Sequence, residues 1–474
     1  MKRITLTIVT ICIACVGVAD AESNEALEAW KAYATKSGNS DHAKWVEEIS
    51  KPEAIALAKA WKELRGYDAH DLIAAAEPDV PAELKPGLTI SKGNAANFPW
   101  LKDYLPQQTY ESLTSTDWGT IGQITIVPTN SYYLTQAMHD ATKEMIAQNI
   151  VPSVNAKGEL MNPDGSFTLL DGVTANAIPF LNPKDGMELN WSYVAHAVGG
   201  ESLFFKPIRF TACTGGANAK VDRHYAADLW WQKFHGRGLV EPFGDVDGKD
   251  DYIEGGSIFF LEPFDIRGLA GVRQRYAKAD ADDDFRVFIP SLRRTRVLTG
   301  SDAQDPLASG LEVTWDDWRA YWGKTDPGKF EYKLTGEGFI LALPEVGHVY
   351  DPYKLTESQC SLESVELELR PVWKLEIVDT TGKYVYKTRT TWVDKENYYM
   401  QYHVTTDPRD NIMRIWDDVR AFRPATGEAQ WRFVMISNFV NKRFNFLEMW
   451  PTWENRAELL GEEKFDVDQL RDYQ

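Results

Sequence analysis

Short runs of aromatic and β-branched residues alternate with turn-forming residues over the last roughly 190 residues of the chain. Three such runs span 372–378, 384–393 and 398–405, and the pattern continues through 413–422 and 430–440. Gly, Asn, Asp and Pro stand between the runs, which is typical of tight turns. The pattern therefore predicts an antiparallel meander.

Residues of different character alternate along these runs, which predicts a sheet with one wet and one apolar face. In the second run the polar set is Lys387, Arg389 and Thr391, and the opposite set is Tyr386, Thr388, Thr390 and Trp392. The apolar face of such a sheet must be covered, and the cover is a helix, a second sheet or a bound ligand. With this assignment, the candidates to line a ligand cavity are Tyr386, Trp392, Tyr402 and Trp416, and an ordinary core role is the alternative for each.

Helical spacing replaces this pattern near the start of the chain. Apolar residues recur at helical spacing in 22–76, and a mixed stretch follows, with a strand-like 122–127 and a helix-like 134–148. An Asn-Pro-Asp-Gly turn signal predicts a hairpin within 155–170. Strands dominate again from about residue 208.

Two helices are expected to interrupt the strand-rich half, at 224–234 and 314–322. The resulting division of the chain has five parts. They are a signal peptide (1–21), an N-terminal helical segment (22–76), a mixed α/β lead-in that packs on the barrel (77–207), an antiparallel β-barrel-like domain (208–455) and a C-terminal tail (456–474).

The first residues predict export from the cytoplasm. A positive Met1-Lys2-Arg3 precedes an apolar run over 4–18 and a small-x-small cleavage site at Ala19-Asp20-Ala21. No later segment approaches the roughly 20 apolar residues of a membrane-spanning helix. We therefore expect a periplasmic protein that begins at Glu22, with outer-membrane association as a further expectation. Acylation at Cys15 is the alternative reading.

Two cysteines, Cys213 and Cys360, remain after the signal peptide is removed. In an oxidising compartment they form either a disulfide or two separate buried thiols. No CxxC pair occurs outside the signal peptide, and the histidines do not pair at metal-ligand spacing. The sequence therefore predicts no metal site.

The net charge of −19 makes the chain a poor candidate for binding nucleic acid. Nucleophile elbows, zinc helices, phosphate loops and dinucleotide fingerprints are absent from the sequence. We therefore predict neither a catalytic residue nor a cofactor. A dispersed acidic protein with 43% hydrophobic residues and 17 Trp suits a carrier of something apolar.

Three arginines, Arg293, Arg294 and Arg296, follow the strand that ends at Pro290. Asp302 and Asp305 come soon after, at a distance that lets the chain fold back and pair with them. Such pairs fix the mouth of a barrel structurally, and the alternative is that the arginines grip a lipid head group or a partner protein.

Ordered motifs give the chain a family resemblance. They include Phe285-x-x-Phe288-Ile289-Pro290-x-x-Arg293-Arg294-x-Arg296, the stretch around Tyr350, Asp351, Tyr353 and Lys354, and Tyr386-Lys387-x-Arg389-x-x-Trp392-Val393-Asp394. The sequence over about 85–455 resembles an uncharacterised Gram-negative family of secreted proteins. That family is similar to the outer-membrane lipoprotein-sorting carriers LolA and LolB.

The resemblance implies a mainly β fold with helices, namely a curved, incompletely closed antiparallel β-barrel with covering helices and a cavity for acyl chains. It also implies that the protein works with an inner-membrane exporter and an outer-membrane β-barrel. Exposing a sixteen-carbon chain to water costs on the order of 12 kcal/mol, so a carrier needs a preformed apolar cavity.

The leading hypothesis is a periplasmic, non-enzymatic carrier or binding protein for a lipid-like hydrophobic ligand, within an envelope transport system. A secreted enzyme acting on a glycan or ester is the alternative, because the chain is rich in aromatic and acidic residues. A scaffold whose exposed strand edge docks a partner is the third reading.

Overall fold

One curved sheet organises the molecule. The computed structural model describes residues 24–77, 79–115, 120–169, 172–196, 201–215, 219–279, 281–299, 302–320, 324–357, 360–449, 452–454 and 461–473. Within these ranges, seventeen strands belong to a single sheet, and β3 (Ser153–Val154) and β4 (Leu160–Met161) form a separate small hairpin. The predicted signal peptide (1–21) lies outside the described residues.

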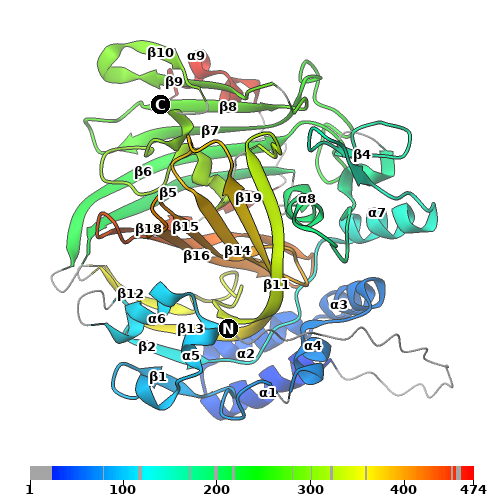
Figure 1. Cartoon of the computed structure of the whole chain (residues 1–474), viewed down its shortest axis with the longest axis vertical. Coiled ribbons are helices and arrows are strands. Elements are labelled where there is room, and N and C mark those ends of the chain that lie inside the picture. Colours follow the sequence, from blue (N-terminus) through cyan, green and yellow to red (C-terminus); the bar gives the residue numbers. More distant parts are fainter. Residues whose placement is uncertain are drawn as a thin grey trace.

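The sheet has two arms (Figure 1). The first arm consists of β5 (Ser202–Thr214), β6 (Lys220–Lys233), β7 (Tyr252–Glu262), β8 (Ala270–Tyr276), β9 (Asp284–Ile289) and β10 (Arg294–Val297). The second consists of β11 (Phe330–Ala342), β13 (Ser361–Asp379), β14 (Thr388–Asp394), β15 (Met400–Thr406), β16 (Ile412–Arg423), β17 (Glu428–Asn438) and β18 (Arg443–Met449). Antiparallel pairing of β5 with β18 joins the arms.

The barrel is not closed. Among the described residues, β10 pairs with β9 and β11 pairs with β13, so these two strands are the open edges of the main sheet. Short strands extend it: β1 (Thr89–Ser91), β2 (Gln123–Ile126), β12 (Tyr353–Thr356) and β19 (Thr452–Glu454). The expected fold class, a mainly β protein with a curved and incompletely closed barrel, is confirmed.

Helices cover the sheet on several sides. They are α1 (Glu25–Ser37), α2 (Ser40–Ile49), α3 (Pro52–Arg65), α4 (Ala69–Ala75), α5 (Leu101–Tyr104), α6 (Gln107–Thr114), α7 (Gln136–Ala147), α8 (Gly186–His196) and α9 (Val467–Leu470). Short 3-10 turns are η1 (Ala95–Asn97), η2 (Gly172–Asn176), η3 (Pro290–Leu292), η4 (Asp302–Gln304), η5 (Trp315–Ala320) and η8 (Glu462–Phe465).

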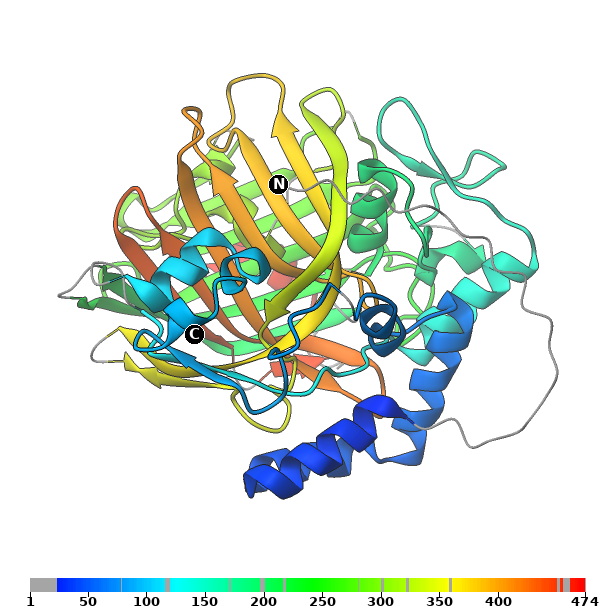
Figure 2. The same cartoon turned by 60° about the horizontal axis from the view of Figure 1, so that its bottom comes forward.

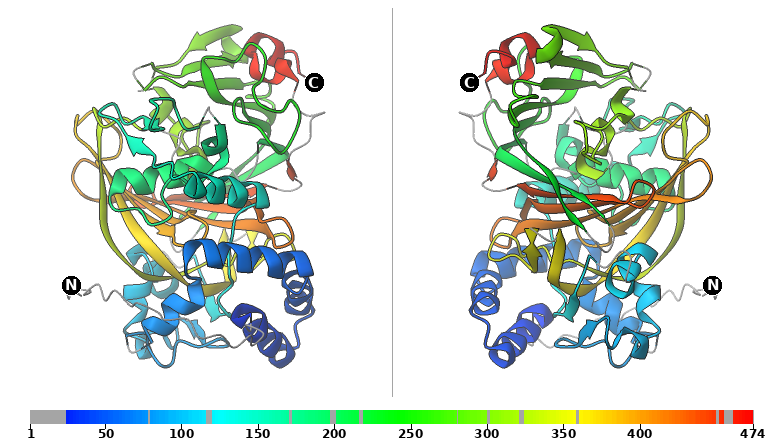
Figure 3. Two further views of the ribbon diagram at one scale, coloured as in Figure 1. Left: turned by 90° about the vertical axis from the view of Figure 1, so that its right-hand side faces the viewer. Right: turned by 90° about the vertical axis from the view of Figure 1, so that its left-hand side faces the viewer.

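The layers are clearest in the side views. In Figure 3, the orange strands of the second arm cross the middle of the molecule, with the blue N-terminal helices on one side and the green first arm on the other. Figure 2 shows the second arm as a curved wall. Helix α8 lies on the inner side, where it packs against β11 and β13. Two faces of the sheet therefore bury separate cores.

The N-terminal helical segment forms as its sequence predicts. Asn24 caps α1 by accepting a hydrogen bond from the Leu27 backbone, and Gly38 ends the helix in the left-handed conformation. Pro52 occupies the first turn of α3, and Gly66 ends it. Because the helical spacing and these caps are local, the pattern of residues 22–76 was sufficient to predict that this segment is helical.

The predicted meander is confirmed in β13 to β17, but the predicted helix at 224–234 is wrong, because residues 224–233 belong to β6. Its residues 225–232 are buried on both faces of the sheet. A strand covered on both sides loses its alternation and is easily mistaken for a buried helix. The helix predicted at 314–322 is the 3-10 turn η5 over its described part.

Within the described residues, no helix combines the length and apolar character needed to cross a bilayer.

Candidate functional site

An irregular segment, residues 302–317, lies against the concave face of the sheet between its two arms. Leu311 and Val313 of this inserted segment are buried in one core with Leu229 of the first arm and Trp416 of the second. The segment is largely without regular structure apart from short 3-10 turns. It therefore occupies the space where a helix, a second sheet or a bound ligand was expected to cover the sheet.

Trp315 is one apolar contact of the inserted segment with the first arm. Its indole meets Phe285 edge to face, with ring centroids 4.9 Å apart. The ring also lies over Gly271, where an added Cβ would come within 2.7 Å of the indole. Glycine at position 271 therefore makes room for Trp315.

Arg273 of β8 binds the inserted segment by charge. Its Nη1 donates to Asp316 Oδ1 at 2.8 Å, and its Nε donates to Asp283 Oδ2 at 2.9 Å. All three side chains are almost fully buried. Burial by itself would raise the pKa of Asp283, but Arg275 and Arg273 outweigh it and hold the pKa below its usual value.

The second arm binds the same segment through tyrosines and an arginine. Tyr384 donates to Asp316 Oδ2 at 2.8 Å, and Tyr386 donates to Asp317 Oδ2 at 3.0 Å. Arg414 of β16 lies 3.5 Å from Asp317. Burial disfavours its charged form, but the pKa of Arg414 is raised by Tyr386, Asp317 and Glu312.

Two further contacts complete this polar cluster. Arg414 Nη2 lies 3.6 Å from Glu312 Oε2. Arg389 of β14 donates to the Tyr384 hydroxyl at 2.5 Å, and its guanidinium lies 5.0 and 4.9 Å from the ring centres of Tyr384 and Tyr386. The cluster therefore joins both arms of the sheet through the inserted segment.

Cavities border the inserted segment on several sides. One, of about 410 Å³, lies beside residues 306 and 309–312. Two others are lined by Trp315 or Asp316. The smaller of these two is apolar, with a volume of about 50 Å³, and lies between Leu229, Ile258 and Trp315. The larger one, about 490 Å³, lies near the two open edges of the sheet and carries Lys324, Lys329 and Lys383 among its lining residues.

Arg273 and Phe285 line both the apolar cavity and the larger one, so the two lie next to each other. Sites for drug-sized ligands have volumes of roughly 300–1,000 Å³, and the apolar cavity is far smaller. This apolar cavity is therefore too small for the acyl chain that was expected to bind in a preformed cavity, because the inserted segment fills the concave face.

The four predicted cavity residues lie on two different faces. Tyr386 and Trp416 are buried on the concave side. Tyr402 and the half-buried Trp392 pair across β15 and β14 on the opposite side, where they pack with Ile340. Of the four residues that the sequence assigned to one cavity face, only Tyr386 and Trp416 therefore lie on the face that holds the inserted segment.

The predicted wet face is wrong at Arg389 and Thr391, which are fully buried. Lys387 is exposed and pairs with Asp410 at 2.7 Å. The alternation fails because Arg389 is stabilised on the inner face by Tyr384 and Tyr386, so residue charge does not report the exposed side here.

The arginines 293, 294 and 296 lie at the exposed edge formed by η3 and β10. Among the described residues none of them pairs with Asp302 or Asp305, and the expected pairing at the mouth is not found there. Asp302 instead accepts hydrogen bonds from the backbone and hydroxyl of Thr299. The choice between a head group and a partner protein at this edge stays a prediction.

The other predicted motif residues lie away from this edge. Tyr350 donates to Glu366 at 2.8 Å, and Asp351 pairs with Arg432 at 3.1 Å. Tyr353 stacks on Phe433 with ring centroids 4.1 Å apart, and Lys354 pairs with Glu363 at 2.6 Å. These contacts hold β12 and its neighbours on the sheet.

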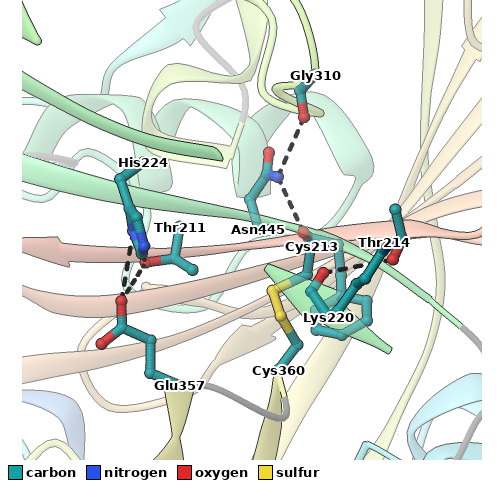
Figure 4. Close-up of a disulfide and its surroundings, with 10 residues drawn as sticks. Thr211, Cys213, Thr214, Lys220, His224, Gly310, Glu357, Cys360 and Asn445 are labelled. Atoms are coloured by element: carbon teal, nitrogen blue, oxygen red, sulfur yellow. Dashed lines mark hydrogen bonds and ion pairs between the residues drawn. A yellow bond between two sulfur atoms is a disulfide. The ribbon is translucent and has the colours of Figure 1, made fainter. Parts of the chain in front are cut away.

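Cys213 of β5 and Cys360, which lies just before β13, form a disulfide (Figure 4). Beside it, His224 of β6 lies 3.3 Å from Glu357. The bridge joins residues 147 positions apart and ties the second arm to the first.

A second buried polar cluster lies where the N-terminal helices meet β13. Arg370 pairs with Asp394 and Glu396, each at 2.7 Å. Nearby, Glu368 accepts hydrogen bonds from Tyr132 and Asn130, and its burial raises its pKa to about 7. In the part of the chain that the structure describes, no group of three His, Cys, Asp or Glu residues is placed to hold a metal ion.

Sequence reasoning missed the inserted segment and its partners. Arg273, Trp315, Asp316, Asp317 and Arg414 come from distant parts of the chain, and no local spacing connects them. The Trp-Asp-Asp-Trp run at 315–318 reads as one turn of a surface helix. The one available signal was the unusual density of Asp beside Trp.

Comparison with solved structures finds proteins of low identity. A DUF1329 family protein from Desulfovibrio piger shares 14% identity and a TM-score of 0.42, covering 58% of this chain and 93% of that chain. A domain described as outer membrane lipoprotein-sorting, from Vibrio parahaemolyticus, shares 15% identity and a TM-score of 0.42, covering 60% and 98%. A LolA superfamily protein from Nitrosomonas europaea shares 12% identity and a TM-score of 0.34, covering 56% and 91%.

A comparison with curated proteins found no match. The family model described as "Protein of unknown function (DUF1329)" matches residues 89–471, which is most of the chain and includes both arms of the sheet and the inserted segment. The chain therefore belongs to the DUF1329 family.

Proposed function

We propose that the protein is a non-enzymatic carrier or binding protein for a lipid-like hydrophobic ligand. One observation carries the proposal: the apolar concave face of the sheet is covered by an irregular segment and one helix, rather than by a second sheet. Leu311, Val313 and Trp315 take the place of a core layer there. When a cover of this kind moves away from the face, no hydrogen bonds between strands have to break.

Ligand entry requires the inserted segment to move. A long acyl chain does not fit in about 50 Å³, whereas the space that residues 307–315 fill would extend the apolar cavity along the concave face. Tyr386 and Trp416 are the predicted cavity residues that would then contact the ligand. Trp392 and Tyr402 pack on the opposite face, so we assign them to the core.

We place this activity in the periplasm, in an envelope transport system with an inner-membrane exporter and an outer-membrane β-barrel as partners. The signal-like first residues support export, and a disulfide is typical of an oxidising compartment. The division of the chain into a helical segment, a lead-in, a barrel-like domain and a tail stays part of the proposal.

No specific observation favours the alternative of an enzyme for glycans or esters. The larger cavity is lined by several aspartates, but Asp283 and Asp316 are paired with Arg273, and Asp379 accepts hydrogen bonds within its own turn. These contacts hold the carboxylates in structural roles.

The test is mass spectrometry of the organic extract from protein purified gently out of native periplasm, beside a mock purification. We expect one lipid or other hydrophobe at near-stoichiometric amounts. An empty protein that also fails to take up a fluorescent fatty acid would overturn the proposal.

A matched pair of variants sharpens the uptake measurement. Gly271→Ala adds a Cβ under Trp315 and should loosen the inserted segment, so the fluorescent fatty acid should bind faster and more tightly. Gly336→Ala is the control, because an added Cβ there meets nothing within 4 Å. Equal uptake by the two variants would count against movement of the segment.

A further inference from the structure

We propose that Arg273, Arg389 and Arg414 form a binding site for the anionic head group of an amphiphile, and that carboxylates of the inserted segment occupy this site in the closed protein. The inference rests on the proposed function and names the class of ligand. Arg273 lies on β8, Arg389 on β14 and Arg414 on β16. The site therefore spans the two arms of the sheet.

The three arginines gather on one internal surface. Arg389 and Arg414 both lie against the ring of Tyr386, with guanidinium carbons 4.9 and 5.4 Å from its centre. Tyr384 connects Arg389 to Arg273. Its hydroxyl accepts a hydrogen bond from Arg389 and donates one to Asp316, which Arg273 binds. A single anionic group entering here meets donors from both arms.

The residues that fill this site have the chemistry of the ligand we infer. The inserted segment presents apolar side chains, Leu311, Val313 and Trp315, directly beside three carboxylates. Asp316 binds Arg273, and both Glu312 and Asp317 lie within 3.6 Å of Arg414. An apolar body with an adjacent negative charge is also the description of an anionic lipid.

The cavities supply a path to the site. The larger cavity is lined by Asp316 and Tyr384, and its charged residues are Arg273, three lysines and five aspartates. Arg273 separates it from the apolar cavity under Trp315. A head group that reaches Arg273 from the larger cavity therefore has an apolar space on its inner side for the start of its tail.

Replacing the carboxylates of the inserted segment by a ligand keeps the buried arginine charges compensated when the ligand is an anion. The same replacement is unfavourable when the ligand is neutral. A ligand carboxylate or phosphate that displaces Asp316 and Asp317 leaves each buried arginine with a partner. A neutral amphiphile that displaced them would leave Arg273 with Asp283 and Arg414 with Glu312, so each buried guanidinium group would lose one carboxylate partner, which is destabilising. Ion pairs with a purely structural role give no such preference between ligands that share one tail.

The experiment compares ligands with the same sixteen-carbon tail: the fatty acid, the fatty alcohol and lysophosphatidic acid. Each displaces a fluorescent fatty acid from the full mature protein. We expect the anionic ligands to bind at least about tenfold more tightly than the alcohol, which corresponds to one retained charge contact. Their mutual order distinguishes a carboxylate from a phosphate head group.

Variants identify the residues that cause the preference for anionic ligands over the alcohol. Asp316→Asn with Asp317→Asn keeps the shape of the segment but removes its charge, so we expect tighter binding of the anionic ligands and a larger preference over the alcohol. Gly271→Ala loosens the segment without changing charge and should raise the affinity for all three ligands together. Arg414→Met should reduce the preference, whereas Arg409→Met, in an exposed turn, should not.

The outcomes separate the two proposals. Equal affinities for acid and alcohol in the wild type and in the Asp316→Asn, Asp317→Asn variant would overturn the head-group site but leave the carrier function standing. Failure of all three ligands to bind would overturn the carrier function and this inference with it. If Arg414→Met does not fold, the asparagine variant still decides, because it retains every arginine.

Discussion

Arg65 and Glu396 form a fully buried ion pair at 3.4 Å although they are 331 positions apart in the chain. Arg65 ends helix α3, and Glu396 follows strand β14. Glu396 also binds Arg370 at 2.7 Å, and Arg65 donates to the backbone oxygens of Tyr132 and Glu396. The N-terminal helices are therefore fixed to the second arm by charge as well as by packing.

Arg65→Ala should lower the free energy of unfolding by about 3–5 kcal/mol, because it leaves the buried Glu396 with less compensation. Urea denaturation followed by tryptophan fluorescence measures the change. Lys59→Ala is the matched control on the same helix, and its exposed 3.9 Å pair with Glu63 should contribute less than about 1 kcal/mol. Equal effects would show that the helix is not fixed through Arg65.

Cys213→Ala with Cys360→Ala should lower the free energy of unfolding by about 2–5 kcal/mol, since the bridge closes a loop of 147 positions. Both sites are buried, so reductant alone should act slowly on the folded wild type. To check this, reductant is added to the wild type under denaturing conditions, and the melting temperature is measured with and without this treatment. An unchanged melting temperature in the double variant would contradict a role of the bridge in stability.

Glu368 should make stability depend on pH. Burial raises its pKa from an ordinary 4.5 to about 7, so the folded state holds a proton that the unfolded state has released between these values. The contribution of Glu368 is therefore complete below about pH 4.5 and is lost as the pH rises through 7, on the order of 3 kcal/mol in total.

The variant Glu368→Gln isolates this contribution, because the amide cannot ionise. The difference in unfolding free energy, wild type minus variant, should fall as the pH rises from 5 to 8, which denaturation curves at several pH values would show. Glu363→Gln, at an exposed position of the same strand, is the control for replacing a glutamate by its amide. A flat difference for Glu368→Gln would refute the raised pKa.

The elements with local signals were predictable from sequence. The turns between β13 and β17 carry Gly, Asn, Asp and Pro, and the helices of residues 22–76 carry their own caps. Strand β6 was misread because both of its faces are buried. The local alternation of polar and apolar residues indicates which face of a strand meets water. It gives no information where both faces are buried.

The candidate site depends on contacts between distant residues. Arg273, Asp316 and Tyr384 come together because the inserted segment returns between the arms, and nothing in the spacing of these residues shows that return. Arg389 illustrates the same limit: its charge predicts the wet face, but two tyrosines satisfy it inside. The chemistry of the residues was visible in sequence, and their assembly was not.

The division of faces in β14 and β16 gives the last prediction. Trp416 is buried on the concave side, whereas Trp392 is half-exposed on the other side under Lys374. Trp416→Ala should therefore cost about 3–5 kcal/mol of unfolding free energy, and Trp392→Ala clearly less. Lys387→Glu, which removes one exposed pair with Asp410, should cost about 1 kcal/mol or less. Urea denaturation of the three variants gives the order of their losses in unfolding free energy. A larger loss at Trp392 than at Trp416 would mean that the concave face is the less well packed of the two faces. That result is expected if the inserted segment is readily displaced even without ligand.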